Sequence, residues 1–293
     1  MSTLHDTASD SSALPEFPSD IKLVVSDMDG TLLNERSQVP ERFWGLLREL
    51  LDRGIHFAPA SGRQYASVAH LFPGFADRMY IIADNGNMVV HRGETISLTS
   101  IPKDQVMRAI TTVRQRIADG ADLGVVVCGV RSAYIERVDP DFLEHVKTYH
   151  MLLQEVENLD DAVAADDVIK LAIYDFANPE DGLADALRAA VPDLQTAVSG
   201  AHWVDVMDPV TTKGVAIRRL QEHFHITPDQ TVVFADYLND AAMIPEAKYS
   251  FAMANAHPEI ASAARYSAPS NADKGVLTVL EHLLRQLDEQ KGS

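Results

Sequence analysis

The sequence predicts an α/β fold in which a doubly wound parallel sheet of Rossmann type is interrupted by an inserted α+β domain. Three observations lead to this prediction. Apolar, β-branched runs alternate with amphipathic helical patterns up to Asn87. The same alternation returns after residue 200, whereas the stretch between mixes strands and helices in another order. The length of 293 residues, with 46% hydrophobic and 23% charged residues, suffices for one large or two medium domains.

The first part of the chain has the pattern of a β-α-β-α-β run. Its first strand ends in an Asp-Gly turn signal, and its first helix begins at Pro40 and ends at Gly54. The expected elements are a strand over 21–26, a helix over 40–53, a strand over 55–60, a helix over 64–71 and a strand over 79–83. Because β-α-β connections are right-handed crossovers, these strands should lie parallel.

The middle and last parts of the chain differ in their order of elements. In the middle we expect strands over 123–127, 133–137, 168–175 and 195–198, and helices over 103–118, 139–149 and 179–191. In the last part we expect a helix over 214–224, a strand over 231–235, a helix from Asp240, a strand over 249–252 and a helix from Gly275. The prediction is therefore a disordered tail over 1–19, a discontinuous core domain over 20–87 and 200–287, and an inserted domain over 88–199.

Charge and cysteine content restrict the partners and the compartment. The net charge of −18 argues against a nucleic-acid partner, because such proteins usually carry a basic face. The chain begins with an acidic, Ser-rich stretch unlike a secretory signal, and no apolar run approaches the roughly 18 residues of a membrane helix. The single cysteine, Cys128, lies in an apolar run and has no partner for an intrachain disulfide. These features indicate a cytoplasmic protein with neither a nucleic-acid nor a membrane partner, and they do not indicate an oligomeric state.

Polar residues follow the expected core strands at the points where the strands end. They are Asp27 and Asp29 after the first strand, Ser61 and Arg63 after the second, Asp84 and Asn85 after the third, Asp236, Asn239 and Asp240 after the strand over 231–235, and Lys213 at the start of a helix. In an open parallel sheet, ligands bind at the carboxyl ends of the strands, so these groups should converge on one edge.

This set of residue types favours phosphoryl-transfer chemistry. Several carboxylates in one place repel one another unless a cation lies among them, and oxygen ligands alone favour Mg²⁺ over zinc. A lysine and a hydroxyl group would orient the remaining phosphate oxygens. One carboxylate can then attack phosphorus, while a second protonates the leaving oxygen and later activates water.

Six segments resemble motifs of the haloacid dehalogenase (HAD) superfamily of phosphatases, in its Cof-like branch. They are Asp27-Met28-Asp29-Gly30-Thr31-Leu32-Leu33, Ala60-Ser61-Gly62-Arg63, Asn85-Gly86, Lys213-Gly214, Asp236-Tyr237-Leu238-Asn239-Asp240 and Met253-Ala254-Asn255-Ala256. The order and wide spacing of these segments, from about Ile21 to Leu284, make the resemblance specific, although each motif alone is a weak pattern.

The resemblance implies a Mg²⁺-dependent phosphatase acting on a small phosphorylated metabolite, such as a sugar phosphate, a nucleotide or a cofactor phosphate. It also implies a role for each matching residue. Asp27 would be the nucleophile and a metal ligand; Asp29 the general acid/base and, through its carbonyl, a metal ligand; Asp236 a further metal ligand; Asp240 a support of the metal site or of Lys213; and Ser61, Gly62, Arg63, Lys213 and Asn239 binding groups for phosphate or substrate. The inserted domain would be the α/β cap that closes over the site and selects the substrate.

The sequence departs from the family pattern at two positions. Ala235 stands where the fourth motif usually has Gly, which allows a close backbone approach beside the metal ligand Asp236. We expect a small shift there. Asn87 stands where a small apolar residue is more usual, and it could touch the substrate.

Several alternatives remain open at this point. Arg63 could form a salt bridge to a core carboxylate instead of touching substrate, and Ser61 could simply cap the next helix. Within the inserted domain, Arg131, Tyr134, Glu136 and Lys170 could line the substrate pocket or face solvent. For function, the alternatives are phosphotransfer to a sugar, as in mutases of the same superfamily, and a non-catalytic phosphate-binding regulator.

Overall fold

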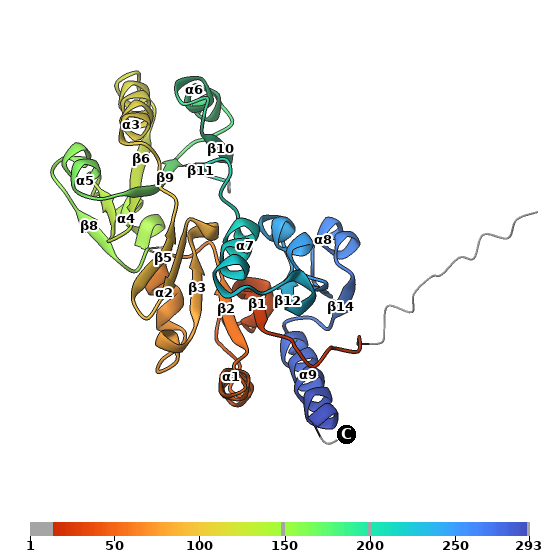
Figure 1. The fold of residues 1–293 in the computed structure, drawn as a ribbon. Coiled ribbons are helices and arrows are strands. Elements are labelled where there is room, and N and C mark those ends of the chain that lie inside the picture. Colours follow the sequence, from red (N-terminus) through yellow and green to blue (C-terminus); the bar gives the residue numbers. More distant parts are fainter. Residues whose placement is uncertain (1–13, 148–149, 199–200, 292–293) are drawn as a thin grey trace, which may run out of the picture.

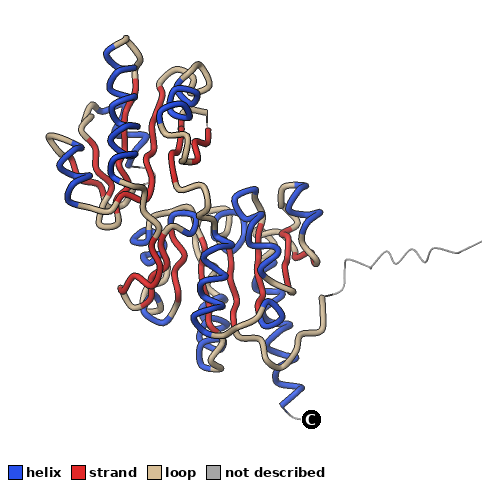
Figure 2. Tube along the Cα trace, turned by 45° about the horizontal axis from the view of Figure 1, so that its top comes forward, coloured by secondary structure: helices blue, strands red, loops and turns tan. Residues whose placement is uncertain are grey.

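The computed structural model describes residues 14–147, 150–198 and 201–291, and they form two lobes that two chain segments connect (Figures 1 and 2). Each lobe contains one sheet with its own covering helices and apolar core. The larger sheet is mainly parallel, as an α/β fold requires. The predicted fold class is therefore confirmed.

The larger sheet has eight strands in the order β14-β13-β12-β1-β2-β3-β4-β5. The strands are β1 Leu23–Asp27, β2 His56–Ala60, β3 Tyr80–Ala83, β4 Met88–His91, β5 Glu94–Leu98, β12 Thr231–Ala235, β13 Tyr249–Met253 and β14 Tyr266–Ala268. From β14 to β3 neighbouring strands are parallel, and β3, β4 and β5 are joined antiparallel. From β1 the chain adds β2 and β3 toward one edge of the sheet and later adds β12, β13 and β14 toward the other edge. This change of direction gives the sheet its doubly wound topology and places β1 and β12 side by side at the centre.

Helices cover both faces of the larger sheet (Figure 1). They are α1 Phe43–Asp52, α2 Tyr65–His70, α7 Lys213–Phe224, α8 Pro258–Ala263, α9 Gly275–Lys291 and the long 3₁₀ segment η5 Leu238–Glu246. Along β1, Val24 packs in the cluster that includes α1, α2 and α9, whereas Leu23 and Val25 pack with α7 and η5. This alternation means that β1 is buried on both faces, which explains its continuous apolar run.

The smaller sheet has six strands in the order β10-β11-β9-β6-β7-β8. The strands are β6 Leu123–Gly129, β7 Ala133–Ile135, β8 Leu153–Glu155, β9 Val168–Asp175, β10 Gln195–Val198 and β11 Trp203–Met207. The helices of this lobe are α3 Lys103–Ala118, α4 Pro140–Lys147, α5 Leu159–Ala165 and α6 Leu183–Ala190. Helices α3, α5 and α6 contribute to the core on one face, and α4 to the core on the other.

The predicted domain boundaries are wrong at both ends of the insert. Residues 88–98, which the prediction places in the inserted domain, form β4 and β5; β4 pairs antiparallel with β3, and β5 with β4, so both extend the larger sheet. Residues 203–207, which the prediction places in the core domain, form β11, an inner strand of the smaller sheet that pairs with β9 and β10. The inserted domain therefore spans residues 101–207. Sheet membership depends on the pairing partner, and a strand's own sequence does not specify that partner. The predicted boundary at 199–200 lies outside the described residues.

Part of the predicted N-terminal tail is packed against the core domain. Phe17 is buried, its N–H donates to Gln286 Oε1 at 2.8 Å, and its carbonyl accepts from Gln290 Nε2 at 2.9 Å. The expectation of disorder is therefore wrong for residues 14–19, because one buried aromatic anchors them to α9. Helix α9 also continues to Lys291, beyond the expected end of the core domain at residue 287. The rest of the predicted tail, residues 1–13, lies outside the described residues.

Two further expectations concern the ends of elements and membrane spans. Residues 148–149, expected at the end of a helix, lie outside the described residues, and α4 is described to Lys147. Within the described ranges, no helix combines the length and the apolar character needed to cross a bilayer.

Candidate active site

The candidate site lies at the carboxyl edge of the larger sheet, where β1, β2, β3 and β12 end next to one another. Asp27 is the last residue of β1, and its Cα partner on β2 is Ala60, which directly precedes Ser61. Asp236 directly follows β12, and Asp84 directly follows β3. Parallel pairing thus brings together side chains that are far apart in the chain, as the sequence pattern predicted.

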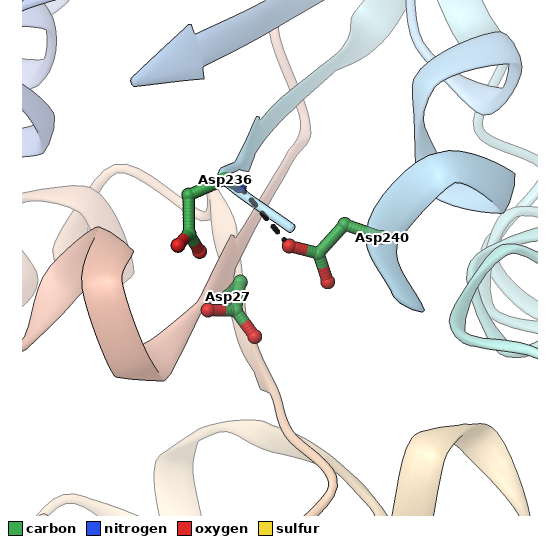
Figure 3. A group of neighbouring side chains, drawn as sticks. All are labelled: Asp27, Asp236 and Asp240. Carbon is green, nitrogen blue, oxygen red and sulfur yellow. Dashed lines mark hydrogen bonds between the residues drawn. The ribbon is translucent and has the colours of Figure 1, made fainter. Parts of the chain in front are cut away.

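Three carboxylates form a compact cluster at this edge. Asp27, Asp236 and Asp240 each present an oxygen atom within 4.8 Å of the others (Figure 3). Asp240 reaches the cluster from η5, and its Oδ2 accepts hydrogen bonds from the backbone N–H of Asp236 at 3.1 Å and of Tyr237 at 3.3 Å. These bonds orient Asp240 and link η5 to the end of β12.

Lys213 balances part of this negative charge from the start of α7. Its Nζ is buried and donates to Asp27 Oδ1 at 2.5 Å and to Asp240 Oδ1 at 2.7 Å. Burial alone would lower the pKa of Lys213, but the charges of Asp27 and Asp240 raise this pKa above its ordinary value. Lys213 is therefore a charged ammonium group. The interpretation of Lys213 as a solvated surface residue does not fit this position.

A close approach between the backbones of Gly86 and Thr212 fixes the start of α7. Gly86, with φ +98°, follows Asn85, and a Cβ atom at Gly86 would lie 2.4 Å from the carbonyl oxygen of Thr212. Thr212 caps α7, because its hydroxyl accepts from the N–H of Val215. The Asn-Gly motif therefore permits the contact that places Lys213 opposite Asp27.

Burial also affects the carboxylates themselves. It raises the pKa of Asp27 well above its ordinary value, although the Lys213 ammonium opposes this shift. Burial is likewise the main cause of the raised pKa of Asp236, which Thr31 partly offsets through a hydrogen bond to Oδ1 at 2.8 Å. A group of carboxyl groups that resists ionisation is an environment in which an added cation is favoured.

The loop after Asp27 packs directly on Asp236. Gly30 has φ +82°, and a Cβ atom there would lie 2.3 Å from Asp236 Oδ2. The Gly30 carbonyl accepts from Asn255 Nδ2 at 2.8 Å. Thr31 and Asn255 lie within two of the sequence motifs, and the motifs themselves predict no role for either residue. In the structure, Thr31 bonds to Asp236 and Asn255 bonds to the Gly30 carbonyl, so both hold this loop in place.

Asp29 is paired with Arg63 instead of pointing into the carboxylate cluster. Arg63 donates from Nε to Asp29 Oδ2 at 2.8 Å and from a terminal nitrogen to Oδ1 at 2.5 Å. About half of the Asp29 side chain and a third of the Arg63 side chain are exposed. An ion pair this exposed contributes about 0–1 kcal/mol, so Asp29 can leave it at little cost. The alternative of a salt bridge for Arg63 is therefore realised in this structure, with Asp29 as the partner.

Ser61 and Asn239 lie on the β2–β3 side of the site. Ser61 is buried, and its Oγ accepts from the N–H of Arg63 at 3.1 Å, while the hydroxyl can still donate its own proton. Asn239 Nδ2 donates to Asn85 Oδ1 at 3.3 Å, and that oxygen lies close to Gly62. The predicted phosphate-binding residues are thus neighbours in space.

Ala235, in place of the usual Gly, packs its methyl group among apolar residues. The residue is fully buried and belongs to a small apolar cluster with Ile244, Ala252 and Ile260. Its methyl group fills apolar space behind the site, because successive side chains of a strand point to opposite faces.

Fold and site together define a class: a two-domain α/β protein with a carboxylate–lysine site at the switch point of a doubly wound sheet. Residues 24–280 match the family of haloacid dehalogenase-like hydrolases, and the chain belongs to this family. It is a phosphatase of the Cof-like branch, which confirms the resemblance and the enzyme class that the sequence predicted.

Named relatives and a solved structure agree with this assignment. The chain is 32% identical over 268 residues to 5-amino-6-(5-phospho-D-ribitylamino)uracil phosphatase YbjI of Escherichia coli, covering 90% of this chain and 97% of the relative. It is 24% identical over 249 residues to HMP-PP phosphatase of Serratia proteamaculans, covering 82% and 86%. A crystal structure from Thermotoga maritima superposes with a TM-score of 0.80 at 26% identity, covering 89% of this chain and 97% of the other.

Proposed function

We propose that this phosphatase is Mg²⁺-dependent and hydrolyses a small phosphorylated metabolite through an aspartyl-phosphate on Asp27. The observation that carries the proposal is the buried Lys213 ammonium between Asp27 and Asp240, with Asp236 in the same cluster. A purely structural ion pair would not need a third carboxylate, whose repulsion is costly unless a cation is added.

The residues present fit a hard divalent cation. The three carboxylates offer only oxygen ligands, and their oxygens lie within 4.8 Å of one another. Asp27, Asp236 and the carbonyl of Asp29 would hold Mg²⁺, with Asp240 orienting Lys213 beside them. When bound, the ion supplies positive charge that offsets the carboxylates and the phosphate oxygens.

The residues of this chain can divide the reaction into two displacements. Lys213 engages Oδ1 of Asp27, which leaves Oδ2 to attack phosphorus in line. A bond forms between Oδ2 and phosphorus as the bond to the leaving oxygen breaks, and Asp29, released from Arg63, donates a proton to that oxygen. Water then attacks phosphorus as the bond between phosphorus and Asp27 Oδ2 breaks, Asp29 takes the proton of the water, and inorganic phosphate leaves with Asp27 restored as a carboxylate. Ser61 and Asn239 orient the phosphoryl oxygens.

The relatives supply the first substrate to test. The E. coli relative carries the name of a phosphatase for 5-amino-6-(5-phospho-D-ribitylamino)uracil, and we propose a phosphate ester of this general kind, a polar cytoplasmic metabolite, for this chain. Because the named relatives are phosphatases, water is proposed as the acceptor in place of a sugar hydroxyl.

Substitution of Asp27 tests the proposal. Hydrolysis of p-nitrophenyl phosphate and of the ribitylaminouracil phosphate is measured with Mg²⁺ and after its removal by EDTA. Asp27→Asn should lower kcat by at least about 10³-fold, because the nucleophile is lost. Asp185→Asn, at an exposed position in the inserted domain, should keep the wild-type rate. Activity of Asp27→Asn close to wild type would overturn the nucleophile, and unchanged activity in EDTA would overturn the metal requirement.

A further inference from the structure

Residues of the inserted domain that were candidates for the substrate pocket differ sharply in their surroundings. Tyr134 donates from its hydroxyl to Asp166 Oδ2 at 2.8 Å, and Arg131 is ion-paired with the same carboxylate. Glu136 is paired with an arginine of α3 at 2.7 Å. These three are therefore engaged within the inserted domain. Lys170 is paired instead with Asp205 on the neighbouring strand β11.

Lys170 and Asp205 form a largely buried ion pair on the sheet of the inserted domain. Lys170 lies on β9 and Asp205 on the neighbouring β11, with 3.6 Å between Nζ and Oδ2. Their side chains are only 15% and 12% exposed. The separation is longer than a hydrogen bond, so Asp205 does not use up the three donors of the ammonium group. The pair thus retains capacity for both a hydrogen-bond acceptor and a donor.

The pair lies beside the boundary with the core domain, because Cys128 is the Cα partner of Lys170 on β6 and the next residue, Gly129, lines a small cavity together with Asp84 of the core domain. The Asp84 carboxyl group, at the end of β3 in the larger sheet, is buried close enough for both charges to act on it. Burial raises the pKa of Asp84 to about 7, Lys170 opposes this shift, and Asp205 adds to it. Two domains therefore contribute charged groups to one enclosed region. A small cavity of about 40 Å³ at this boundary is lined by Asp84 and by Gly129, Arg131 and Ser132 of the inserted domain, so Arg131 reaches the boundary as well.

A second polar group in this region has no partner. His150 is 8% exposed, and its Nδ1 makes no hydrogen bond within the described residues. Burial lowers the pKa of His150 to about 4, and the nearby Lys170 ammonium contributes to the shift. A buried polar atom without a partner is uncommon in a finished core and is expected where a ligand supplies the missing bond.

This region lies next to the phosphate end of the candidate active site. Asn85, which directly follows Asp84, accepts from Asn239 Nδ2 and donates from its N–H to the carbonyl of Ser61 at 2.9 Å. A phosphate ester whose phosphorus meets Asp27 therefore has Asp84 beside it, and beyond Asp84 the Lys170–Asp205 pair.

We propose that Lys170 and Asp205 determine substrate specificity by binding the leaving group, and that they select a neutral group rich in hydrogen-bond donors and acceptors. Lys170 donates to a hydroxyl or carbonyl oxygen, and Asp205 accepts from a hydroxyl or N–H. A polyol chain and the amide edge of a heterocycle share this chemistry. An anionic leaving group would instead meet the carboxylate of Asp205. The inference rests on the proposed phosphatase function.

The test compares substrates across variants. Lys170→Met and Asp205→Asn are assayed with ribitol 5-phosphate, UMP, 3-phosphoglycerate and p-nitrophenyl phosphate. We expect kcat/KM to fall about 10-fold or more for ribitol 5-phosphate, UMP or both, mainly through KM, and to fall less for p-nitrophenyl phosphate. A loss of kcat/KM confined to ribitol 5-phosphate means that the pair recognises a polyol leaving group. A loss confined to UMP means that it recognises the polar edge of a heterocycle. Asp205→Asn should also raise kcat/KM for 3-phosphoglycerate relative to kcat/KM for the neutral esters.

Controls separate recognition from structure. Lys103→Met and Asp185→Asn change matched residues at exposed positions of the inserted domain and should leave the substrate preference as in wild type. Because Lys170→Met leaves Asp205 buried without its cation, the double variant Lys170→Met with Asp205→Leu removes both charges and should show the same altered preference. An equal loss for all four substrates would mean that the pair only stabilises the inserted domain, and it would overturn the proposal. So would an unchanged preference.

The outcome also distinguishes this inference from the proposed function. If the wild-type protein hydrolyses none of the esters, the phosphatase proposal fails and takes the specificity proposal with it. If the wild type is active and Asp27→Asn is not, but the Lys170 variants keep the wild-type preference, only the specificity proposal is refuted.

Discussion

Replacement of Lys213 by Met should remove the cation that holds the carboxylate cluster together. The ammonium group is fully buried and bonds to Asp27 and Asp240 at 2.5 and 2.7 Å, so its loss leaves two buried carboxylates without their cation. Breaking a buried ion pair on one side costs about 3–5 kcal/mol. The third carboxylate, Asp236, adds to the repulsion. We therefore expect a loss in the free energy of unfolding within or above this range.

Urea denaturation without Mg²⁺, followed by circular dichroism, measures this loss. With a slope of roughly 2–3 kcal/mol per M, the midpoint should fall by about 1–2.5 M. The double variant Lys213→Met with Asp240→Asn should lose less than the single variant, because one of the two stranded charges is gone. Lys103→Met, at an exposed lysine, is the matched control and should stay within about 0.5 kcal/mol of wild type. A Lys213→Met variant as stable as this control would refute the description of Lys213 as the charge that balances the cluster.

Two further predictions concern Gly30 and Asp84. Gly30→Ala should displace Asp236 and lower kcat for p-nitrophenyl phosphate. Gly54 also has a positive φ of +75°, but a Cβ atom there would meet no other atom, so Gly54→Ala should keep the wild-type kcat. Equal rates for the two variants would contradict the steric explanation. For Asp84, burial raises the pKa to about 7, so the folded state holds a proton that the unfolded chain releases above pH 4. The stability that this proton contributes is therefore lost as pH rises from about 4 to 7. Asparagine does not titrate, so the free energy of unfolding of Asp84→Asn minus that of wild type should be up to roughly 4 kcal/mol larger at pH 8 than at pH 4. Urea midpoints at both pH values check this, and a pH-independent difference would contradict it.

The sequence was a good guide wherever a local pattern carries the information. Helix α3 has the predicted bounds, Lys103–Ala118, because its apolar residues recur at helical spacing. Strands β9 and β12 also have their predicted bounds, since each is an apolar run between turn signals. Strands β4 and β11 were assigned to the wrong domain, because only the pairing partner decides to which sheet a strand belongs.

In the candidate site, too, some features follow from local sequence patterns and others depend on contacts between distant residues. Asp27, Asp236, Asp240 and Lys213 could be named from their places after strands and before a helix, since the carboxyl ends of parallel strands meet at one edge. A salt bridge of Arg63 was one of two alternatives that the sequence left open, but its partner Asp29 was not specified, because an exposed carboxylate has many partners of nearly equal energy.

The sequence by itself determined the fold class, the family and the residues that gather at the sheet edge, because strand periodicity and motif order are local properties. Only the tertiary structure decided where the two domains divide and which residues of the inserted domain face the core. Arg131, Tyr134, Glu136 and Lys170 all have partners inside their own domain, yet they differ in position, since the folded structure places Arg131 and Lys170 beside the boundary with the core. That difference arises from long-range pairing of β9 with β11 and from the packing of one domain against the other.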